Sequence, residues 1–433
     1  MVTGMREMKD SGIEWIGEIP KNWKSLKLQY ACDTITDYTA SGSFADLAAN
    51  VVYRDDEDYA MLVRTADLSA KREMGRVYVD KHAYDYLHNS NLFGGEIILP
   101  NVGSVGTVYY YSPLYKKATL APNAIMLRTV NNRYLYYLFL TKPAEEALNR
   151  LSNATTQAKF NKTQLRKMKV VLPSLAEQDI IVSYLDSKCA EIDALSADIQ
   201  SEIDTLEAYK RSVITEAVTK GLDKSAPMKD SGIDYVGIIP VSWSIKRLKY
   251  ILEERNYRSE TGLETLLSVS QYFGVVPSYS IQRTMQAKSL VGYKKVYPKD
   301  LVFNKLNPVL ARFGVSAHTG ITSPDFAVYY TDKADTRFLC YLLKTDAYIM
   351  EYGRLCTGVG DGFSRLYTPM LYNIKIAVPS LKEQCIIADY LDSTCAEIDA
   401  IIAQKQEQLA VLADYKKSII YEYVTGKKEV PMA

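Results

Sequence analysis

The chain contains almost the same text twice. The stretch MKDSGIEWIGEIPKNW at residues 8–23 returns as MKDSGIDYVGIIPVSW at residues 228–243. A second stretch, PSLAEQDIIVSYLDSKCAEIDA at residues 173–194, matches residues 379–400 at 17 of 22 positions. An internal repeat decides the architecture before any single motif does. The sequence therefore predicts a tandem duplication.

A third and weaker echo, RYLYYLFL at residues 133–140 against RFLCYLLK at residues 337–344, keeps the order of the other two. Between the repeated stretches, residues 24–172 and 244–378 hold short alternating runs with Gly, Asn and Pro turns, which predict strands. These two inserts barely resemble each other. The predicted fold class is α/β (α+β), with two mixed globular domains, each followed by a long helix. The predicted segments are a first domain at 1–173, a first helix at 174–221, a second domain at 222–379, a second helix at 380–427 and a tail at 428–433.

The predicted helices begin at S-x-x-E capping boxes, formed by Ser174 with Glu177 and by Ser380 with Glu383. Apolar residues then recur at spacings of three, four and seven, so they share one face of each helix. A helix of this kind needs a partner, and we expect the two to pair as an antiparallel coiled coil. The alternative is a pair of ordinary core helices in separate domains. The predicted seam consists of Leu185, Ile192, Leu195, Ile199, Ile203, Leu206, Val213, Leu391, Ile398, Ile401, Leu409, Leu412 and Ile419.

The charge of the chain is unevenly distributed. The whole chain carries +1, but residues 174–221 carry ten acidic and four basic side chains, and residues 380–427 carry eight acidic and five basic ones. The remainder therefore carries +10, which favours a polyanionic partner for the globular domains. Uneven surface decoration is the alternative explanation.

Basic residues of the inserts cluster beside Gly, Asn and Gln at turns. Lys and Arg neutralise phosphates, and Arg, Asn and Gln also bind base edges in the major groove. Each single residue can equally be a solvated surface charge. The candidate DNA-binding residues are Arg64, Lys71, Arg72, Arg76, Lys116, Lys117, Lys159, Lys162, Arg255, Arg258, Lys288, Lys294, Lys305, Arg312 and Arg365.

Motifs of catalysis and of metal binding are weak or missing. TGVGDGF at residues 357–363 has glycine spacing like that of a nucleotide loop, but it lies just before a boundary strand, so a loop explains it better. NPVL at 307–310 and SPDF at 323–326 faintly resemble an amino-methyltransferase signature and are better explained as turns. The six cysteines form no CxxC pair, and the three histidines lack zinc-ligand spacing. We expect no catalytic residue and no metal or cofactor on this chain.

Targeting signals are also missing from the sequence. No run of about 18 apolar residues could span a membrane, and the first ten residues contain no apolar segment typical of a secretory signal. The expected compartment is a reducing cytoplasm, and no membrane partner is expected.

Taken together, these features resemble the specificity subunit of type I restriction-modification enzymes. The resemblance rests on the two MKDSGI openings, the two PSL-x-EQ boundaries, Gly94-Gly95-Glu96-Ile97 with Val105-Gly106-Thr107, and GITSPDFAVY at 320–329. It covers essentially the whole chain. This chain departs from the family's Gly-Asp before a strand, where it has Gly95-Glu96 and Lys299-Asp300.

The resemblance implies two target-recognition domains that each read half of a split site in double-stranded DNA, with the helices as a spacer. The implied partners are two methyltransferase subunits, which use S-adenosylmethionine to methylate adenine, and two motor-nuclease subunits, which use ATP and Mg²⁺. The chain itself would be a non-catalytic subunit. Two alternatives remain open: a self-sufficient DNA adenine methyltransferase and a non-catalytic coiled-coil adaptor.

Overall fold

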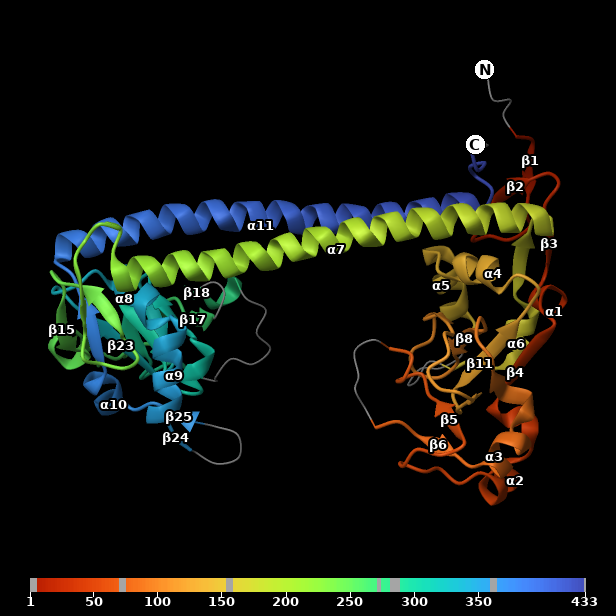
Figure 1. Ribbon diagram of the computed structural model, residues 1–433, viewed down its shortest axis with the longest axis horizontal. Helices are drawn as coiled ribbons and strands as arrows, with labels where there is room; N and C mark the ends of the chain where they lie inside the picture. Colours follow the sequence, from red (N-terminus) through yellow and green to blue (C-terminus); the bar gives the residue numbers. More distant parts are fainter. Residues whose placement is uncertain are drawn as a thin grey trace. The chain divides into compact units, whose positions relative to one another are not determined.

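The chain divides into two compact units. The first comprises Met1–Ile199 together with Glu407–Ala433, and the second comprises Gln200–Gln406. Each contains one globular region and part of each of two long helices, α7 (Leu175–Lys220) and α11 (Leu381–Val424) (Figure 1). The computed structural model describes residues 6–69, 75–152, 159–270, 274–280, 289–358 and 364–431.

The globular region of the first unit is a mixture of short strands and helices. In chain order its strands and helices are β1 (Met8–Asp10), β2 (Glu18–Pro20), β3 (Lys24–Lys27), α1 (Leu28–Ala31), β4 (Thr34–Asp37), α2 (Phe44–Asn50), β5 (Ala60–Val63), β6 (Tyr78–Val79), α3 (Lys81–Tyr86), β7 (Asn91–Leu92), β8 (Ile97–Pro100), β9 (Tyr109–Tyr110), β10 (Ala118–Leu120), β11 (Ala124–Arg128), α4 (Asn132–Phe139), α5 (Lys142–Arg150), α6 (Lys162–Lys167) and β12 (Lys169–Leu172).

Two four-stranded sheets organise this region. One has the order β4-β11-β8-β9 and is antiparallel, while the other has the order β6-β5-β10-β7 with one parallel pair, β5 with β10. Successive side chains of a strand point to opposite faces. Thus Ile97 and Leu99 of β8 pack on helices α4 to α6, whereas Ile98 packs toward the other sheet. Burial on both faces explains why this strand is apolar throughout.

The second unit repeats this plan with different side chains. Its strands and helices are β13 (Met228–Asp230), β14 (Ile238–Pro240), β15 (Ser244–Arg247), β16 (Glu253–Glu254), β17 (Leu267–Ser270), β18 (Gly274–Pro277), β19 (Lys294–Val296), β20 (Leu301–Asn304), β21 (Phe313–Val315), β22 (Gly320–Thr322), β23 (Phe326–Tyr330), α8 (Thr336–Leu343), α9 (Asp346–Leu355), β24 (Thr357–Gly358), β25 (Ser364–Arg365), α10 (Thr368–Asn373) and β26 (Lys375–Val378). The sheet β16-β23-β20-β21 matches β4-β11-β8-β9 strand for strand. The predicted duplication of two mixed domains is therefore confirmed.

The repeated stretches meet at the start of each long helix. Strand β3, which follows the opening text, pairs antiparallel with β12, which directly precedes α7. Strands β15 and β26 do the same before α11. The repeated stretches thus bring the first and last strands of each globular region together, where the chain enters and leaves it.

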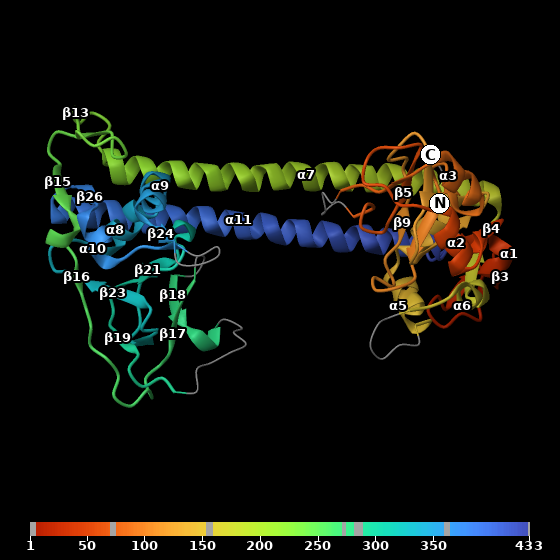
Figure 2. The ribbon, with the colours of Figure 1, turned by 90° about the horizontal axis from the view of Figure 1, so that it is seen from below.

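Helices α7 and α11 pair antiparallel, as expected. In the first unit Lys416 Nζ lies 2.6 Å from Asp193 Oδ1, and in the second Lys210 Nζ lies 2.6 Å from Asp399 Oδ2. Residue numbers rise along one helix as they fall along the other. Figure 2 shows the two helices alongside each other from a second direction.

The residues between the helices follow a heptad pattern with alternating spacings of four and three. On α7 the seam residues are Leu185, Cys189, Ile192, Ser196, Ile199, Ile203, Leu206, Lys210, Val213 and Ala217. On α11 they are Leu391, Cys395, Ile398, Ile402, Lys405, Leu409, Leu412, Lys416, Ile419 and Tyr423. Two predicted seam residues are wrong, because Leu195 is 49% exposed and Ile401 is 43% exposed. Ser196 and Ile402, one position further on, occupy the seam.

The predicted capping boxes are only half correct. The hydroxyl of Ser174 accepts the backbone N–H of Glu177, and Ser380 accepts that of Glu383, each at 3.3 Å. The glutamate side chains do not return to the caps. Each instead accepts a hydrogen bond from a tryptophan indole, because a buried N–H without an acceptor would be costly.

Candidate nucleic-acid interface

Two of the candidate basic residues in the first unit are neutralised within the protein. Arg64 Nη2 lies 2.7 Å from Asp67 Oδ1 and also donates to the carbonyl of Gly75 at 2.7 Å. The hydrogen bonds that Arg64 donates to the Asp67 carboxylate raise the pKa of Arg64. Lys162 Nζ lies 2.8 Å from Asp37 Oδ1. These two cations stabilise the turn after β5 and the start of α6.

Lys116 and Lys117 lie on the surface among tyrosines. Lys117 donates to the Tyr59 hydroxyl and lies over the rings of Tyr59 and Tyr84, at 4.3 and 5.5 Å from their centroids. Lys116 lies 5.1 Å from the ring centroid of Tyr115. Cation–π contact leaves the ammonium charge intact, so both lysines remain available to a phosphate.

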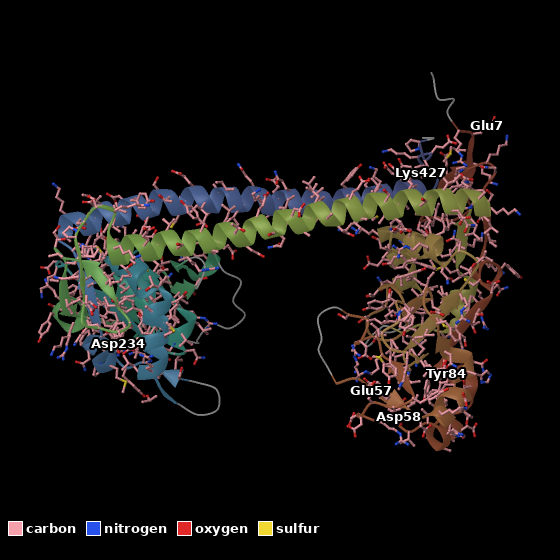
Figure 3. The ribbon with its side chains drawn as sticks, in the orientation of Figure 1. Glu7, Glu57, Asp58, Tyr84, Asp234 and Lys427 are labelled. Carbon is pink, nitrogen blue, oxygen red and sulfur yellow. The ribbon has the colours of Figure 1, made fainter. Side chains whose placement is uncertain are left out.

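Acidic residues accompany this tyrosine-rich edge. Figure 3 shows Glu57 and Asp58 near Tyr84, at the end of the first unit away from α7. Their charges reduce the positive potential around Lys116 and Lys117. The other candidates of this unit, Arg76 and Lys159, are exposed.

In the second unit Arg255 and Lys294 serve the fold. Arg255 donates two hydrogen bonds, of 3.0 and 3.1 Å, to the carboxylate of Asp300. Its guanidinium carbon lies 4.3 Å from the ring centroid of Tyr330. Lys294 is buried and lies 2.9 Å from Glu254 Oε1. Their charges are matched by carboxylates, so neither is free to neutralise DNA.

The remaining candidates of the second unit differ in their surroundings. Arg258 and Arg312 are exposed, and Arg258 donates to the carbonyl of Gly292 at 2.8 Å. Lys305 and Arg365 are both half-buried. The segments that carry them lie next to each other, because Leu306, the residue after Lys305, forms a β-bridge with Arg365. Lys71, Arg72 and Lys288, together with residues 359–363 of the glycine-rich stretch, lie outside the described residues.

Lys305 and Arg365 are half-buried cations with few ion-pair contacts. Lys305 makes no ion pair or side-chain hydrogen bond to any residue that the structure describes. Burial, with help from the charges of Lys294 and Arg365, lowers the pKa of its ammonium group. Arg365 has one ion-pair contact, of 3.5 Å, with Asp325. This pair combines two partly buried cations with a single ion pair of 3.5 Å, an arrangement that favours an anionic or acceptor-rich ligand.

The sequence interpretation missed the residues that fix each globular region to its helix. In the first unit Arg133 Nε lies 2.8 Å from Asp186 Oδ1, and Tyr137 donates to the same oxygen at 2.5 Å. Arg133 also stacks on Tyr110 and Tyr136. All three residues lie in the repeated stretches, where they recur as Arg337, Tyr341 and Asp392. Their repetition in the sequence could have identified them as structurally important.

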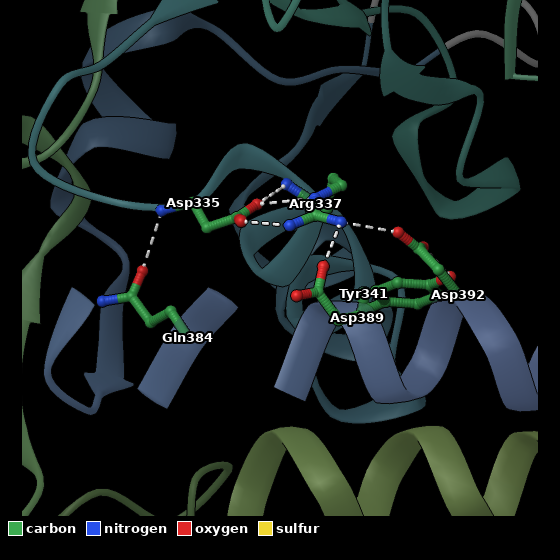
Figure 4. A network of polar contacts seen from close by, with 6 residues as sticks. All are labelled: Asp335, Arg337, Tyr341, Gln384, Asp389 and Asp392. Carbon is green, nitrogen blue, oxygen red and sulfur yellow. Dashed lines mark hydrogen bonds and ion pairs between the residues drawn. The ribbon is translucent and has the colours of Figure 1, made fainter. Parts of the chain in front are cut away.

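The second unit has the matching joint, drawn in Figure 4. Arg337 contacts three carboxylates, those of Asp335 and Asp389 at 2.7 Å and that of Asp392 at 2.9 Å. Tyr341 donates to Asp392 at 2.8 Å. The carboxylates of α11 thus attach α8 to this helix.

A groove of about 920 Å³ lies beside the start of α7 in the first unit. Exposed Ile180 and half-buried Tyr184 contribute apolar surface, while Arg6 and Lys428 contribute positive charge. Both cations are paired, Arg6 with Glu177 and Lys428 with Glu422, and acidic residues also line the groove. The groove therefore offers apolar surface and no excess of positive charge.

Within the described ranges, no group of three or more His, Cys, Asp or Glu side chains could hold a metal ion. None of the helices in the described part of the chain is long and apolar enough to cross a membrane.

Known proteins share both sequence and fold with this chain. The type I restriction-modification specificity subunit MjaVIII of Methanocaldococcus jannaschii is 26% identical over 340 residues, covering 73% of this chain and 76% of that protein. The putative MjaX specificity subunit of the same organism is 24% identical over 438 residues, covering 96% of both chains. A solved chain, from work on complex assembly and conformational transition of the type I R-M system, has a TM-score of 0.66. It is 14% identical and covers 95% of this chain and 99% of its own, so it shows the shared fold.

The family model described as the type I restriction modification DNA specificity domain matches residues 44–205 and 315–411. These ranges cover more than half of the chain and fall once in each half of the repeat. The chain therefore belongs to the family of type I restriction-modification DNA specificity subunits.

Proposed function

We propose that this chain is the DNA-reading subunit of a type I restriction-modification complex and that it recognises a target in two parts. The observation that carries this proposal is the presence of two units with the same strand order and frame but different polar side chains. The repeated strands and helices would place the two globular regions on the DNA in equivalent ways, as the two subunits of a two-fold dimer are placed. Different side chains would let the two half-sites differ.

The long helices would set the separation of the half-sites. The two ion pairs, Asp193 with Lys416 and Lys210 with Asp399, obey the internal repeat. Asp193 and Asp399 are 206 residues apart, and so are Lys210 and Lys416. Polar residues within a coiled-coil seam fix its register. A fixed register would give the target a gap of fixed length.

Two methyltransferase subunits would dock on the repeated surfaces of the helices. Leu175 and Ile180 on α7 are exposed, and so are their counterparts Leu381 and Ile386 on α11. Exposed apolar residues at matching places favour protein–protein contact, and their duplication favours two copies of one partner. Two motor-nuclease subunits would join through those partners.

The chemistry would reside on the partners. The methyltransferase subunits would use S-adenosylmethionine to methylate adenine, and the motor-nuclease subunits would use ATP with Mg²⁺ for cleavage. The chain itself would contribute no catalytic residue, cofactor or metal, and it would act on DNA in the cytoplasm. Neither a self-sufficient methyltransferase nor a coiled-coil adaptor is favoured by the family assignment.

The test is to mix the purified full chain with random duplex DNA and to sequence the bound fraction. Recovery of one consensus, with two defined parts and a constant gap, supports the proposal. Binding without any sequence preference contradicts it. Mapping methylated adenine in cells with and without the gene gives an independent readout, because only the reading subunit would set the site.

A further inference from the structure

The two units share one structural position that their sequences fill differently. In the first unit the chain leaves β8, and Val102 forms a β-bridge with Lys159. In the second it leaves β20, and Leu306 forms a β-bridge with Arg365. The backbone N–H of Phe160 donates to the carbonyl of Asn101 at 3.1 Å, and in the second unit Leu366 donates to Lys305 at 3.0 Å.

Backbone conformation confirms that these positions correspond. The residue after each bridge has a left-handed backbone, with φ of +81° at Gly103 and +47° at Asn307. Lys159 and Arg365 are also separated by 206 residues, the offset that relates the two long helices. Asn101 therefore corresponds to Lys305, and Lys159 corresponds to Arg365.

Each pair, Asn101 with Lys159 and Lys305 with Arg365, holds one buried polar atom without a partner. Four such side-chain atoms occur in the described residues, and two of them are Asn101 Oδ1 and Arg365 Nε. An unsatisfied buried polar atom destabilises the folded chain. The two atoms belong to different members of the pairs, but both lie beside the same β-bridge of their unit. This shared location points to a ligand at the same place in each unit.

The nature of the missing partner can be read from the two atoms. Asn101 Nδ2 already donates to the carbonyl of Phe160 at 3.2 Å, so its free Oδ1 needs a donor. Arg365 Nε needs an acceptor. A phosphate offers acceptors alone, whereas base edges in the major groove offer both amino donors and oxygen or nitrogen acceptors. A base edge satisfies both positions, and a phosphate satisfies only one.

We propose that Asn101 with Lys159, and Lys305 with Arg365, form equivalent base-reading subsites, one in each unit. The first takes a base edge with an exposed amino group, as on adenine or cytosine. The second takes the two acceptors of guanine, O6 and N7. The proposal rests on the function proposed above and identifies which residues make the half-sites differ.

The two adjacent cations of the second subsite support guanine as its ligand. Lys305 forms no ion pair with a described side chain, although the charges of Glu254 and Asp325 act on it. The neighbouring cation Lys294 is already bound to Glu254. Asn307 Oδ1 accepts the backbone N–H of Ser364 at 2.9 Å, which fixes the strand that carries Arg365. A fixed arginine beside a second cation is prepared for a bidentate acceptor pair.

Exchange of the pairs tests the proposal directly. The full chain is selected against random duplex DNA as wild type, as Lys305→Asn with Arg365→Lys, and as Asn101→Lys with Lys159→Arg. Each exchange is expected to change the preferred base at one or two positions of one half-site and to leave the other half unchanged. Loss of one bidentate contact corresponds to roughly 5- to 140-fold weaker discrimination.

Controls separate this effect from unfolding and from general charge loss. Lys333→Gln removes an exposed charge from the same unit and should leave the consensus intact. Arg365→Lys alone keeps the charge, and thermal unfolding should show an unchanged midpoint. Equal weakening on all sequences with an unchanged consensus, or no effect at all, overturns the proposal. If the wild-type chain selects no two-part consensus, the proposed function itself fails first, and this proposal fails with it.

Discussion

Trp23 donates a hydrogen bond from its indole Nε1 to Glu177 Oε1 at 3.0 Å. Trp243 and Glu383 make the same bond, also at 3.0 Å, in the second unit. The tryptophan belongs to the opening repeated text, and the glutamate lies in the first turn of the long helix. Both indoles are buried. This bond explains physically why the two repeated stretches occur together, since each supplies half of one joint.

Removal of the glutamate should destabilise the joint. Glu177→Ala leaves the buried Trp23 N–H without an acceptor, which is expected to cost about 1–3 kcal/mol in the free energy of unfolding. Urea denaturation followed by tryptophan fluorescence measures the change. The control is Glu191→Ala on the same helix, whose exposed carboxylate pairs with Lys188 and should show little change. Equal effects of the two variants would mean that the joint does not stabilise the unit.

The position of the seam predicts which apolar residues of α7 matter. Ile203 is 3% exposed, and Ile203→Ala is expected to cost about 2–5 kcal/mol through lost burial and a cavity. Leu195→Ala, at a residue that is largely exposed, should change stability by less than about 0.5 kcal/mol. Chemical denaturation of the two variants provides the comparison. A larger loss at Leu195 would show that the heptad phase is wrong.

Asp335 gives the second unit a dependence on pH. Burial opposes its ionisation, but hydrogen bonds with Arg337 outweigh that effect and lower its pKa below the ordinary value of 3.8. Because the folded-state pKa is depressed, the carboxylate stabilises the fold above pH 3.8, and that stabilisation is lost as the pH falls through the folded-state pKa. Asp335→Asn should cost about 1.5–3 kcal/mol at neutral pH, the range for a charge-assisted hydrogen bond.

The difference in unfolding free energy between wild type and Asp335→Asn should therefore shrink below pH 3.8. Urea denaturation of both proteins across a series of buffers from pH 7 to pH 3 measures it. The side-chain oxygen of residue 335 accepts the backbone N–H of Arg337 at 2.8 Å. Asparagine keeps this oxygen, so the helix cap is the same in both proteins and only the charge differs. A difference that stays constant with pH would contradict the assignment.

The internal repeat made the architecture predictable. The helix caps and the seam were harder to predict, because they depend on contacts between residues far apart in the sequence. The repeated text predicted two mixed domains and two paired helices, because copied sequence implies copied structure. The capping boxes failed because Glu177 meets Trp23, 154 positions away in the sequence. The seam failed at Leu195 because Ser196 continues the heptad, and apolar character alone does not fix a phase of 3.5 residues.

The DNA-binding candidates were also hard to predict from sequence, for the same reason. Arg64, Arg255 and Lys294 look like DNA ligands in the sequence, yet Asp67, Asp300 and Glu254 neutralise them. Such pairs form between residues brought together by the fold, so composition cannot distinguish them from free cations. Asn101 was missed as a candidate because a lone Asn at a strand end carries no local signal.

The helix pair should act as a ruler. Deletion of residues 198–204 together with residues 404–410 removes one heptad from opposed parts of the two helices and preserves the seam. Each helix shortens by roughly 10 Å at about 1.5 Å per residue, and the preferred gap could shift by up to about three base pairs at about 3.4 Å each. Rotation around the DNA axis should also weaken binding. Affinity for duplexes with fixed half-sites and varied gaps is the readout. An unchanged gap in a folded variant would exclude the helices as the spacer.

Each unit is proposed to read its own half of a divided target. The most direct measurement replaces residues 24–172 with the corresponding insert of another family member and maps methylated adenines in cells that carry the partner subunits. One half of the methylated sequence should change to that of the donor, while the other half and the gap stay the same. A change in both halves, or in neither, would contradict the account.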